Sequence, residues 1–425
     1  MKHPMMRRRE FLKGTAVAAA ATLLPLPLTV AEPVPRAAGR REFEVSASLY
    51  AWDLHDEGIE TILDNLQQMA AVNSIYLISP MHPEKRPLTS DAFPHNPVRK
   101  TWMAEDSRIY WHPEMKRYGR IKPRLSDHDW LNQTDWVKVL VEAARKRGMK
   151  TGVEISHTTI DKERAEGELA DCMQRDIHGQ LCQQQESRTS PQRYLHPVCP
   201  NSPDGRQYII ALFCDLAANY DLDYLQWCTI PFDQGGPDKG GCSCDSCIKT
   251  ATAENFDLAK AREVLLKDST AQPETDRWQK FRCNSLARFY KDLNAAVHKI
   301  KPKMDLRFNL YFRNEPAWGV NLKLIRPHLN SLRVMEYTEQ QGNPAAMPQK
   351  RQWLTHVRET IGLDFPVLSA IAVRPKATPE LIRQGVQIAV ECGVAGITLG
   401  HYDGAEFPML RAIREGLVEA KVLNL

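Results

Sequence analysis

The stretch VCPNSPDGRQYIIALFCDLAANYDLDYLQW, residues 198–227, contains one complete unit of the pattern that decides the fold. Ser202 and Pro203 are a typical helix start, because a serine caps the first turn and proline fits the first helical position. Apolar residues then recur at helical spacing up to Leu216. The β-rich run Leu222–Trp227 follows after a short connection, which predicts a helix that returns the chain to a parallel sheet.

The same alternation of β-rich run and amphipathic helix extends along the chain and predicts a (β/α)₈ barrel, an α/β fold. The expected strands are Phe43–Asp53, Asn73–Pro80, Lys150–His157, Leu222–Trp227, Asp305–Phe312, Ser331–Glu339, Phe365–Val373 and Gly396–Gly404. Such a barrel needs about 250 residues, so the surplus must form long loops after strands two and four. An open doubly wound sheet is the alternative, but no Gly-rich phosphate loop follows any strand.

The N-terminus has the pattern of an export signal. Arg8-Arg9-Glu10-Phe11-Leu12-Lys13 resembles the bacterial twin-arginine signal, and the apolar run Ala16–Leu28 precedes the small-residue cleavage site Thr29–Ala31. An ordinary secretory signal is the alternative. We expect a signal peptide over residues 1–31, a linker over 32–42 and one barrel domain over 43–425. The predicted partner is the twin-arginine export machinery, and the predicted location is periplasmic or secreted.

The charge of the mature chain excludes some partners. The sequence has 56 Lys+Arg and 52 Asp+Glu, and residues 1–31 hold five of the former and one of the latter, which leaves 51 of each. No basic patch or charge run remains, so we expect no nucleic acid and no membrane partner after cleavage. The sequence does not indicate the oligomeric state.

Several motifs resemble a family of hypothetical bacterial glycosyl hydrolases with a TIM barrel. They are residues 198–227 followed by CSCDSC at Cys242–Cys247, FPHNP at Phe93–Pro97, and RIKPRLSDHDW at Arg120–Trp130. The resemblance implies a carbohydrate substrate. Many relatives carry an acid at the end of strand four, where this chain has Gln226, and strand seven also ends without an acid. A retaining mechanism with acids on strands four and seven is therefore excluded if the alignment holds.

Other carboxyl groups lie at predicted strand ends, where TIM barrels build their active sites, namely Asp53, Glu154, Glu336, Glu339 and Asp403. Glycoside hydrolysis needs one protonated and one ionised carboxyl group. We predict Glu154 and Glu336 as this pair, with Asp403 as an orienting or third acid. The alternative is that these acids form ion pairs with an arginine and only brace the barrel. The candidate arginines are Arg307, Arg313 and Arg333.

Further residues at the strand ends are predicted to bind the substrate. Aromatic rings offer flat apolar faces to sugar rings, and polar side chains bond sugar hydroxyls. The predicted substrate-binding residues are Trp52, Asp53, His157, Gln226, Trp227, Tyr337 and His401. The second loop adds the aromatic-rich stretch TWMAEDSRIYWHP, residues 101–113.

Three cysteines, Cys242, Cys244 and Cys247, lie within six residues. Pairs so close in sequence strain a disulfide, whereas a Cys-x-x-Cys unit beside glycines suits a tetrahedral thiolate site. We predict a structural zinc ion with Cys199 as the fourth ligand, and His196 or Cys228 as reserves. A disulfide or free thiols are the alternatives, since an exported protein can form disulfides.

Two rival functions remain open. The first is a barrel that binds carbohydrate without hydrolysing it, which Gln226 motivates. The second is a metal-dependent hydrolase or isomerase that uses Glu154 with His82, His157 and His401. These histidines lie on different strands with no helix-borne ligand pair, so that pattern is weak.

Overall fold

The computed structural model describes residues 42–79, 87–88, 93–103, 107–155, 159–182, 184–185, 194–227, 232, 241–311, 315–374 and 376–424. His82, His157, Cys228 and Arg313, which the sequence analysis names, lie outside these residues.

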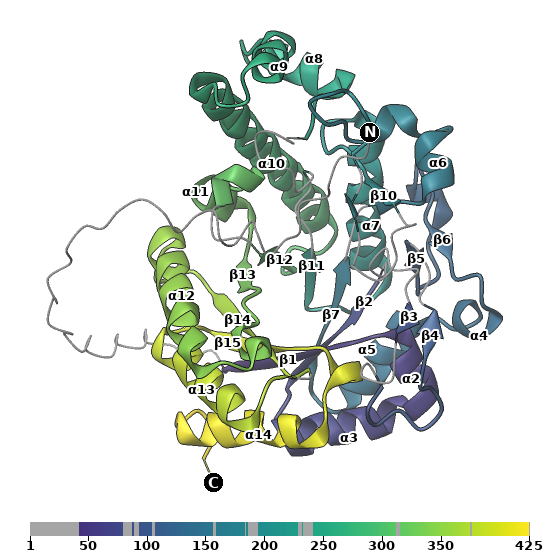
Figure 1. The fold of residues 1–425 in the computed structure, drawn as a ribbon. Coiled ribbons are helices and arrows are strands. Elements are labelled where there is room, and N and C mark those ends of the chain that lie inside the picture. The colour runs from purple at the N-terminus through teal and green to yellow at the C-terminus, as the bar shows by residue number, and fades with distance from the viewer. Residues whose placement is uncertain are drawn as a thin grey trace, which may run out of the picture. The chain divides into compact units, whose positions relative to one another are not determined.

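Eight parallel strands close into a barrel in the order β1-β2-β7-β11-β12-β13-β14-β15, which confirms the predicted fold (Figure 1). Their bounds are Glu44–Leu49, Ser74–Ile78, Lys150–Ile155, Tyr224–Trp227, Asp305–Leu310, Ser331–Val334, Val367–Ala372 and Gly396–Gly400. Each lies within its predicted range. The sixth strand is shorter than predicted, because residues 338–341 turn into the 3₁₀ helix η6 (Thr338–Gln341).

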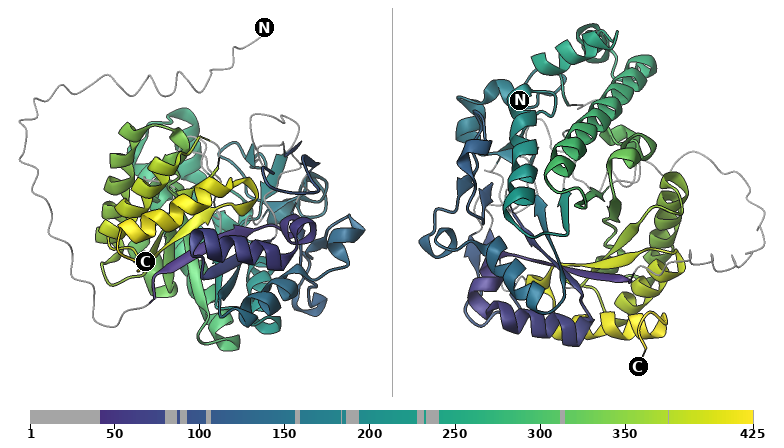
Figure 2. Two further views of the ribbon diagram at one scale, coloured as in Figure 1. Left: turned by 90° about the horizontal axis from the view of Figure 1, so that it is seen from below. Right: turned by 180° about the vertical axis from the view of Figure 1, so that it is seen from behind.

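Helices surround the barrel and follow its strands in turn. Their bounds are α2 Ala51–Glu57, α3 Ile59–Ala70, α4 Asp129–Asn132, α5 Trp136–Lys146, α6 Lys162–Glu166, α7 Pro203–Asn219, α8 Asp245–Ala253, α9 Leu258–Lys267, α10 Gln272–Ile300, α11 Leu322–Ile325, α12 Met347–Ile361, α13 Pro379–Glu391 and α14 Phe407–Glu419. The last helix, α14, packs against both α13 and α3, so the helical layer closes as the sheet does (Figure 2).

The long second loop carries small strands and packs onto the barrel through buried rings. Its strands are β3 Pro87–Leu88, β4 Trp102–Met103, β5 Arg108–Ile109 and β6 Arg124–Leu125. Trp111 and Tyr118 both donate hydrogen bonds to the buried Asp215 of α7, at 3.1 and 2.7 Å. Tyr110 and Trp111 have at most 1% exposed surface, so this part of the aromatic-rich stretch serves packing.

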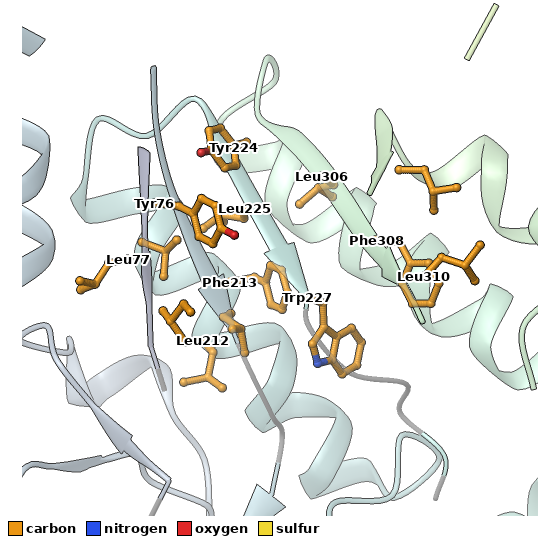
Figure 3. Packing of buried hydrophobic residues seen from close by; sticks show 14 of the residues in the cluster. Tyr76, Leu77, Leu212, Phe213, Tyr224, Leu225, Trp227, Leu306, Phe308 and Leu310 are labelled. Carbon is orange, nitrogen blue, oxygen red and sulfur yellow. The ribbon is translucent and has the colours of Figure 1, made fainter. Parts of the chain in front are cut away.

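The outer face of β11 packs against helices (Figure 3). Trp227 is fully buried there, with Phe213 of α7 at 6.1 Å and Phe289 of α10 at 5.1 Å between ring centroids. The prediction that Trp227 stacks on a sugar is therefore wrong. Successive strand residues point to opposite faces, so Gln226 and Trp227 cannot both face the lumen.

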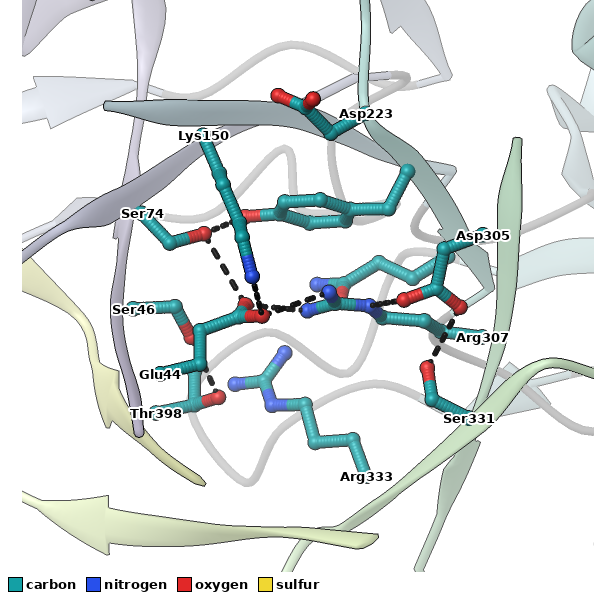
Figure 4. Close-up of polar contacts among 12 residues, drawn as sticks. Glu44, Ser46, Ser74, Lys150, Asp223, Asp305, Arg307, Ser331, Arg333 and Thr398 are labelled. Carbon is teal, nitrogen blue, oxygen red and sulfur yellow. Dashed lines mark hydrogen bonds and ion pairs between the residues drawn. The ribbon is translucent and has the colours of Figure 1, made fainter. Parts of the chain in front are cut away.

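A cluster of buried polar side chains fills the lumen at the N-terminal ends of the strands (Figure 4). Arg307 donates to both carboxylate oxygens of Glu44, at 2.6 and 3.0 Å, and to Asp305 at 2.9 Å. Its guanidinium lies 3.7 Å from the ring centroid of Tyr224. Burial raises the pKa of Glu44, but the charge and hydrogen bonds of Arg307, together with Lys150 and Ser74, outweigh burial and lower that pKa to about 2. Because this cluster occupies the N-terminal end of the lumen, the functional site is sought at the opposite, C-terminal end.

Candidate functional site

Inward-facing side chains of four neighbouring strands converge on one carboxylate oxygen near the C-terminal end of the lumen. The Oε2 atom of Glu154, on β7, accepts hydrogen bonds from Gln226 of β11 at 2.6 Å and Asn309 of β12 at 3.1 Å. Arg333 of β13 donates to the same atom at 2.7 Å. Glu154 and Arg333 both have 1% exposed surface. The ion pair with Arg333 that the sequence analysis considered as an alternative is thus present. We call Glu154, Gln226, Asn309 and Arg333 the upper polar cluster.

The upper polar cluster extends toward the mouth through Arg333. Its Nη2 donates to the Tyr337 hydroxyl at 3.3 Å, and its guanidinium lies 5.2 Å from the ring centroid of Tyr76. Tyr337 is only half-buried and packs its hydroxyl against Gly400, where a Cβ atom would come within 2.5 Å of it. The buried Arg333 Nε and Asn309 Oδ1 have no hydrogen-bond partner among the described residues.

A second group of carboxyls lies at the ends of β1 and β15. Asp403, in the 3₁₀ helix η8 (Tyr402–Gly404), accepts hydrogen bonds from Arg374 at 3.0 Å and from the Gly404 N–H at 2.8 Å. Asp53 is fully buried; its Oδ2 accepts from the Tyr50 N–H at 2.9 Å, and its Oδ1 has no partner among the described residues. Burial, and then the charge of Asp403, raise the pKa of Asp53 well above its ordinary value. Asp53 therefore retains its proton at a pH at which a solvent-exposed carboxyl is ionised.

His401 and Trp52 flank this second group. His401 is half-buried, and its Nδ1 lies 2.7 Å from the Ser48 hydroxyl. Trp52 is fully buried and stacks on Tyr50, with 4.4 Å between ring centroids. Because no ring surface of Trp52 is open, its predicted role as a stacking platform is not compatible with this structure.

Glu336 lies two residues beyond β13. Its Oε1 accepts from the Thr338 hydroxyl at 2.7 Å, and its carbonyl accepts from the buried Lys350 of α12 at 2.7 Å. Lys350 also pairs with Glu339 at 2.8 Å. Glu336 has the same even-numbered spacing as the buried residues Leu332 and Val334, whereas Arg333, between them, faces the lumen. The opposition of Glu336 and Glu154 across the mouth stays a prediction, as does the role of His157.

The four predicted metal ligands lie together. The sulfur atoms of Cys199, Cys242, Cys244 and Cys247 all lie within 4.8 Å of one another, and all four side chains are buried. The Cys199 sulfur is 3.5 Å from both Cys244 and Cys247. A tetrahedron with Zn–S bonds of about 2.3 Å has edges of roughly 3.8 Å, so this donor set fits a four-coordinate metal ion. The cluster can hold a metal ion.

Backbone and side-chain N–H groups support this cysteine cluster. The Arg175 N–H donates to the Cys242 sulfur and Asn201 Nδ2 donates to the Cys247 sulfur, both at 3.3 Å. Hydrogen bonds from Cys199 and its neighbours hold the pKa of Cys244 well below its ordinary value. His196 binds elsewhere, with Nδ1 2.8 Å from the Cys182 carbonyl.

Several residues of the site were not singled out from the sequence, namely Ser48, Asn309, Lys350 and Arg374. Asn309 shares its strand face with Arg307, so the alternation of β12 was the available signal. Arg374 lies beyond β14, where no pattern fixes the direction of a side chain.

Fold and site together define an exported TIM-barrel protein with a buried four-cysteine cluster. The model of the twin-arginine translocation pathway signal sequence matches residues 5–25, so the chain is exported by that route. No described helix is long and apolar enough to span a bilayer. A comparison with curated protein sequences gives no match.

Solved structures similar to this chain are glycoside-cleaving enzymes. An α-L-fucosidase from Paenibacillus thiaminolyticus matches with a TM-score of 0.58 and 15% identity, over 91% of this chain and 51% of that one. A β-galactosidase from Halorubrum lacusprofundi matches with a TM-score of 0.58 and 12% identity, over 90% and 58%. The catalytic domain of a Paenibacillus polymyxa β-amylase matches with a TM-score of 0.52 and 12% identity, over 90% and 99%. The chain thus spans little more than half of the first two, and at such identities the likeness shows the fold.

Proposed function

We propose that the protein is an exported glycoside hydrolase acting on an oligosaccharide or glycoside. The observation that carries this proposal is the presence of carboxyl groups in opposite environments at one barrel mouth. Glu154 is paired with Arg333, whereas burial and the charge of Asp403 raise the pKa of Asp53. Glycosidases need such a contrast, since one group protonates the leaving oxygen while the other acts as base or nucleophile.

In this proposal Glu154 supplies the ionised carboxylate, because three donors stabilise its charge. Asp403 supplies a second charge held by Arg374, and Glu336, two residues beyond β13, remains the candidate acid. Tyr337 and His401 are half-buried, which supports the proposal that they contact a sugar. Arg333 Nε and Asn309 Oδ1 are buried polar atoms that sugar hydroxyls or water can satisfy.

A panel of chromogenic glycosides tests the proposal, beginning with the α-L-fucosides and β-D-galactosides that the similar structures suggest. Glu154→Gln and Asp403→Asn are each expected to lower turnover by on the order of 10²–10⁴-fold, as loss of an acid or base does. Glu380→Gln is the matched control, because Glu380 is exposed on α13. Circular dichroism must show that each variant is folded. Full turnover by folded Glu154→Gln contradicts a catalytic role for Glu154.

A carbohydrate-binding barrel without hydrolysis is the second candidate, and Gln226 favours it. At the end of β11 the Gln226 amide donates to Glu154, at a position where the resemblance to hypothetical glycosyl hydrolases implies an acid. Calorimetric titration with oligosaccharides that the panel does not cleave distinguishes the two. Saturable binding without turnover supports the second candidate, whereas turnover excludes it.

We also propose that the cysteine cluster binds a structural zinc ion. The support is a full set of four buried sulfur donors, which leaves no coordination position for a substrate. The ion would fix the segment after β11 to the turn before α7. We further propose that cleavage after Ala31 releases the barrel domain from its signal peptide.

A further inference from the structure

His95 joins three loops at the mouth of the barrel. It belongs to the FPHNP segment of the second loop, and its Nδ1 lies 3.0 Å from Oε2 of Glu57, in the helix after β1. Its Nε2 lies 3.1 Å from the backbone carbonyl of Tyr402, in the turn after β15. The ring stacks on Phe407 of α14 at 5.1 Å with an interplanar angle of 16°. Only 7% of the His95 side chain and 5% of the Glu57 side chain are exposed.

The two partners of His95 fix its protonation. A backbone carbonyl can only accept a hydrogen bond, so Nε2 must carry a proton. Oε2 of Glu57 accepts from the Tyr402 hydroxyl at 3.0 Å, and a carboxylate oxygen can likewise only accept a hydrogen bond from Nδ1. Both contacts are hydrogen bonds only when both ring nitrogens are protonated, which makes His95 an imidazolium.

A second link holds the same segment and does not depend on a histidine. Arg99 donates to both oxygens of Asp56 at 2.6 and 2.8 Å, and Asn96 donates to Asp56 at 2.9 Å. Burial raises the pKa of Asp56, but the hydrogen bonds from Arg99, His55 and Asn96 and the charge of Arg99 together outweigh burial, and the net shift is downward. Because an arginine stays charged, this link persists where His95 loses a proton.

We propose that His95 is a pH-dependent clamp that fastens residues 93–97 of the second loop to the first and eighth loops and positions Asp403. The link to Asp403 is direct in the chain, since the carbonyl that His95 holds belongs to the preceding residue, Tyr402. Loss of one ring proton removes one of the two hydrogen bonds of His95 and so breaks its link between Glu57 and the Tyr402 carbonyl, while Arg99 retains the segment on α2.

The charged groups around His95 set the direction of the pH dependence. Glu57 faces it from α2, Asp403 from η8, and Phe407 of α14 adds no charge. Burial lowers the pKa of His95, but the hydrogen bond and charge of Glu57 outweigh burial and the net shift is upward. A raised pKa means that the clamp is fully formed below the unfolded value of 6.5 and is lost as the pH rises through the higher folded value.

The experiment titrates the full protein with ¹⁵N-labelled histidine and follows the ring nitrogens by NMR, without any substrate. His95, assigned by its loss in His95→Gln, is expected to show two protonated nitrogens at pH 6.5 and a midpoint above 6.5. In Glu57→Gln the midpoint is expected to fall by about 1 unit or more, as loss of an adjacent charge does. A midpoint below 6.5, or a single protonated nitrogen throughout, overturns the proposal.

Hydrogen exchange of the peptides that contain residues 93–97 and 402–405 measures the clamp itself. After correction for intrinsic rates, exchange is expected to rise on the order of tenfold as the pH passes through the His95 midpoint. His95→Gln is expected to exchange fast at every pH. The matched control is His356→Gln, an exposed histidine on α12 that contacts neither segment and should behave as the native protein does. An equal pH response in the native protein and His95→Gln refutes the clamp whether or not the protein cleaves glycosides.

Discussion

Replacement of Glu44 by glutamine tests whether the lower end of the barrel is held by an ion pair. Glu44 accepts two hydrogen bonds from Arg307 and one from Ser74 at 3.0 Å, and Lys150 lies 3.5 Å away. Its pKa falls from 4.5 to about 2 on folding, with burial opposed and outweighed by Arg307. A shift of roughly 2.5 units, at 1.36 kcal/mol per unit, corresponds to about 3 kcal/mol of stability. Only 8% of the Glu44 side chain is exposed, so solvent screening takes little from this figure.

The sign follows from the lowered pKa. The stabilisation is fully present above pH 4.5 and is lost as the pH falls toward 2. Denaturant unfolding of the mature protein is therefore expected to show Glu44→Gln less stable than the native protein by about 3 kcal/mol at pH 7, with the difference shrinking between pH 4.5 and 2. Glu60→Gln is the control, because Glu60 forms an exposed ion pair with Arg147 worth about 0–1 kcal/mol. A pH-independent difference, or one no larger than in the control, refutes the reasoning.

Three further outcomes are expected. Elemental analysis should find about one zinc per chain, and Cys244→Ser should lose it along with several kcal/mol of stability, whereas Cys283→Ser outside the cluster should keep it. Asp215→Asn should lower the free energy of unfolding by about 2 kcal/mol, since an amide cannot accept all the donors of the second loop; urea titration measures this. Replacement of Arg8 and Arg9 by lysine should leave the precursor in the cytoplasm, which fractionation and mass spectrometry detect.

The sequence predicted the strands well because strand patterns are local. The alternation of β-rich runs with amphipathic helices, and the turn residues between them, placed β7 and β14 within a few residues of their observed bounds. It also predicted the cysteine cluster, since three of the cysteines lie within six residues and the fourth, Cys199, lies in the turn before α7. The sixth strand ended earlier than predicted because Lys350, from a later helix, bonds the Glu336 carbonyl and pairs with Glu339.

The site was predicted less completely because the direction of side chains beyond a strand end depends on distant partners. Glu154 lies within its strand, and its inward direction follows from alternation. The same rule excludes Trp227, which directly follows the inward-facing Gln226. Asp53 was expected to bind a sugar hydroxyl, but only the structure reveals its complete burial and the nearby charge of Asp403. No local pattern connects the first and eighth loops.

The pairing of β1 with β15 has a consequence for synthesis of the protein. Residues 44–47 pair with residues 396–399, so the first strand gains its second neighbour only after β15 has been synthesised. Until then β1 and β14 are open sheet edges, which tend to pair with other chains. Contacts of such long sequence separation also form slowly. The nascent chain therefore gains its closing strand only after residues 44–395 have been made, and its open edges can pair with other chains until then.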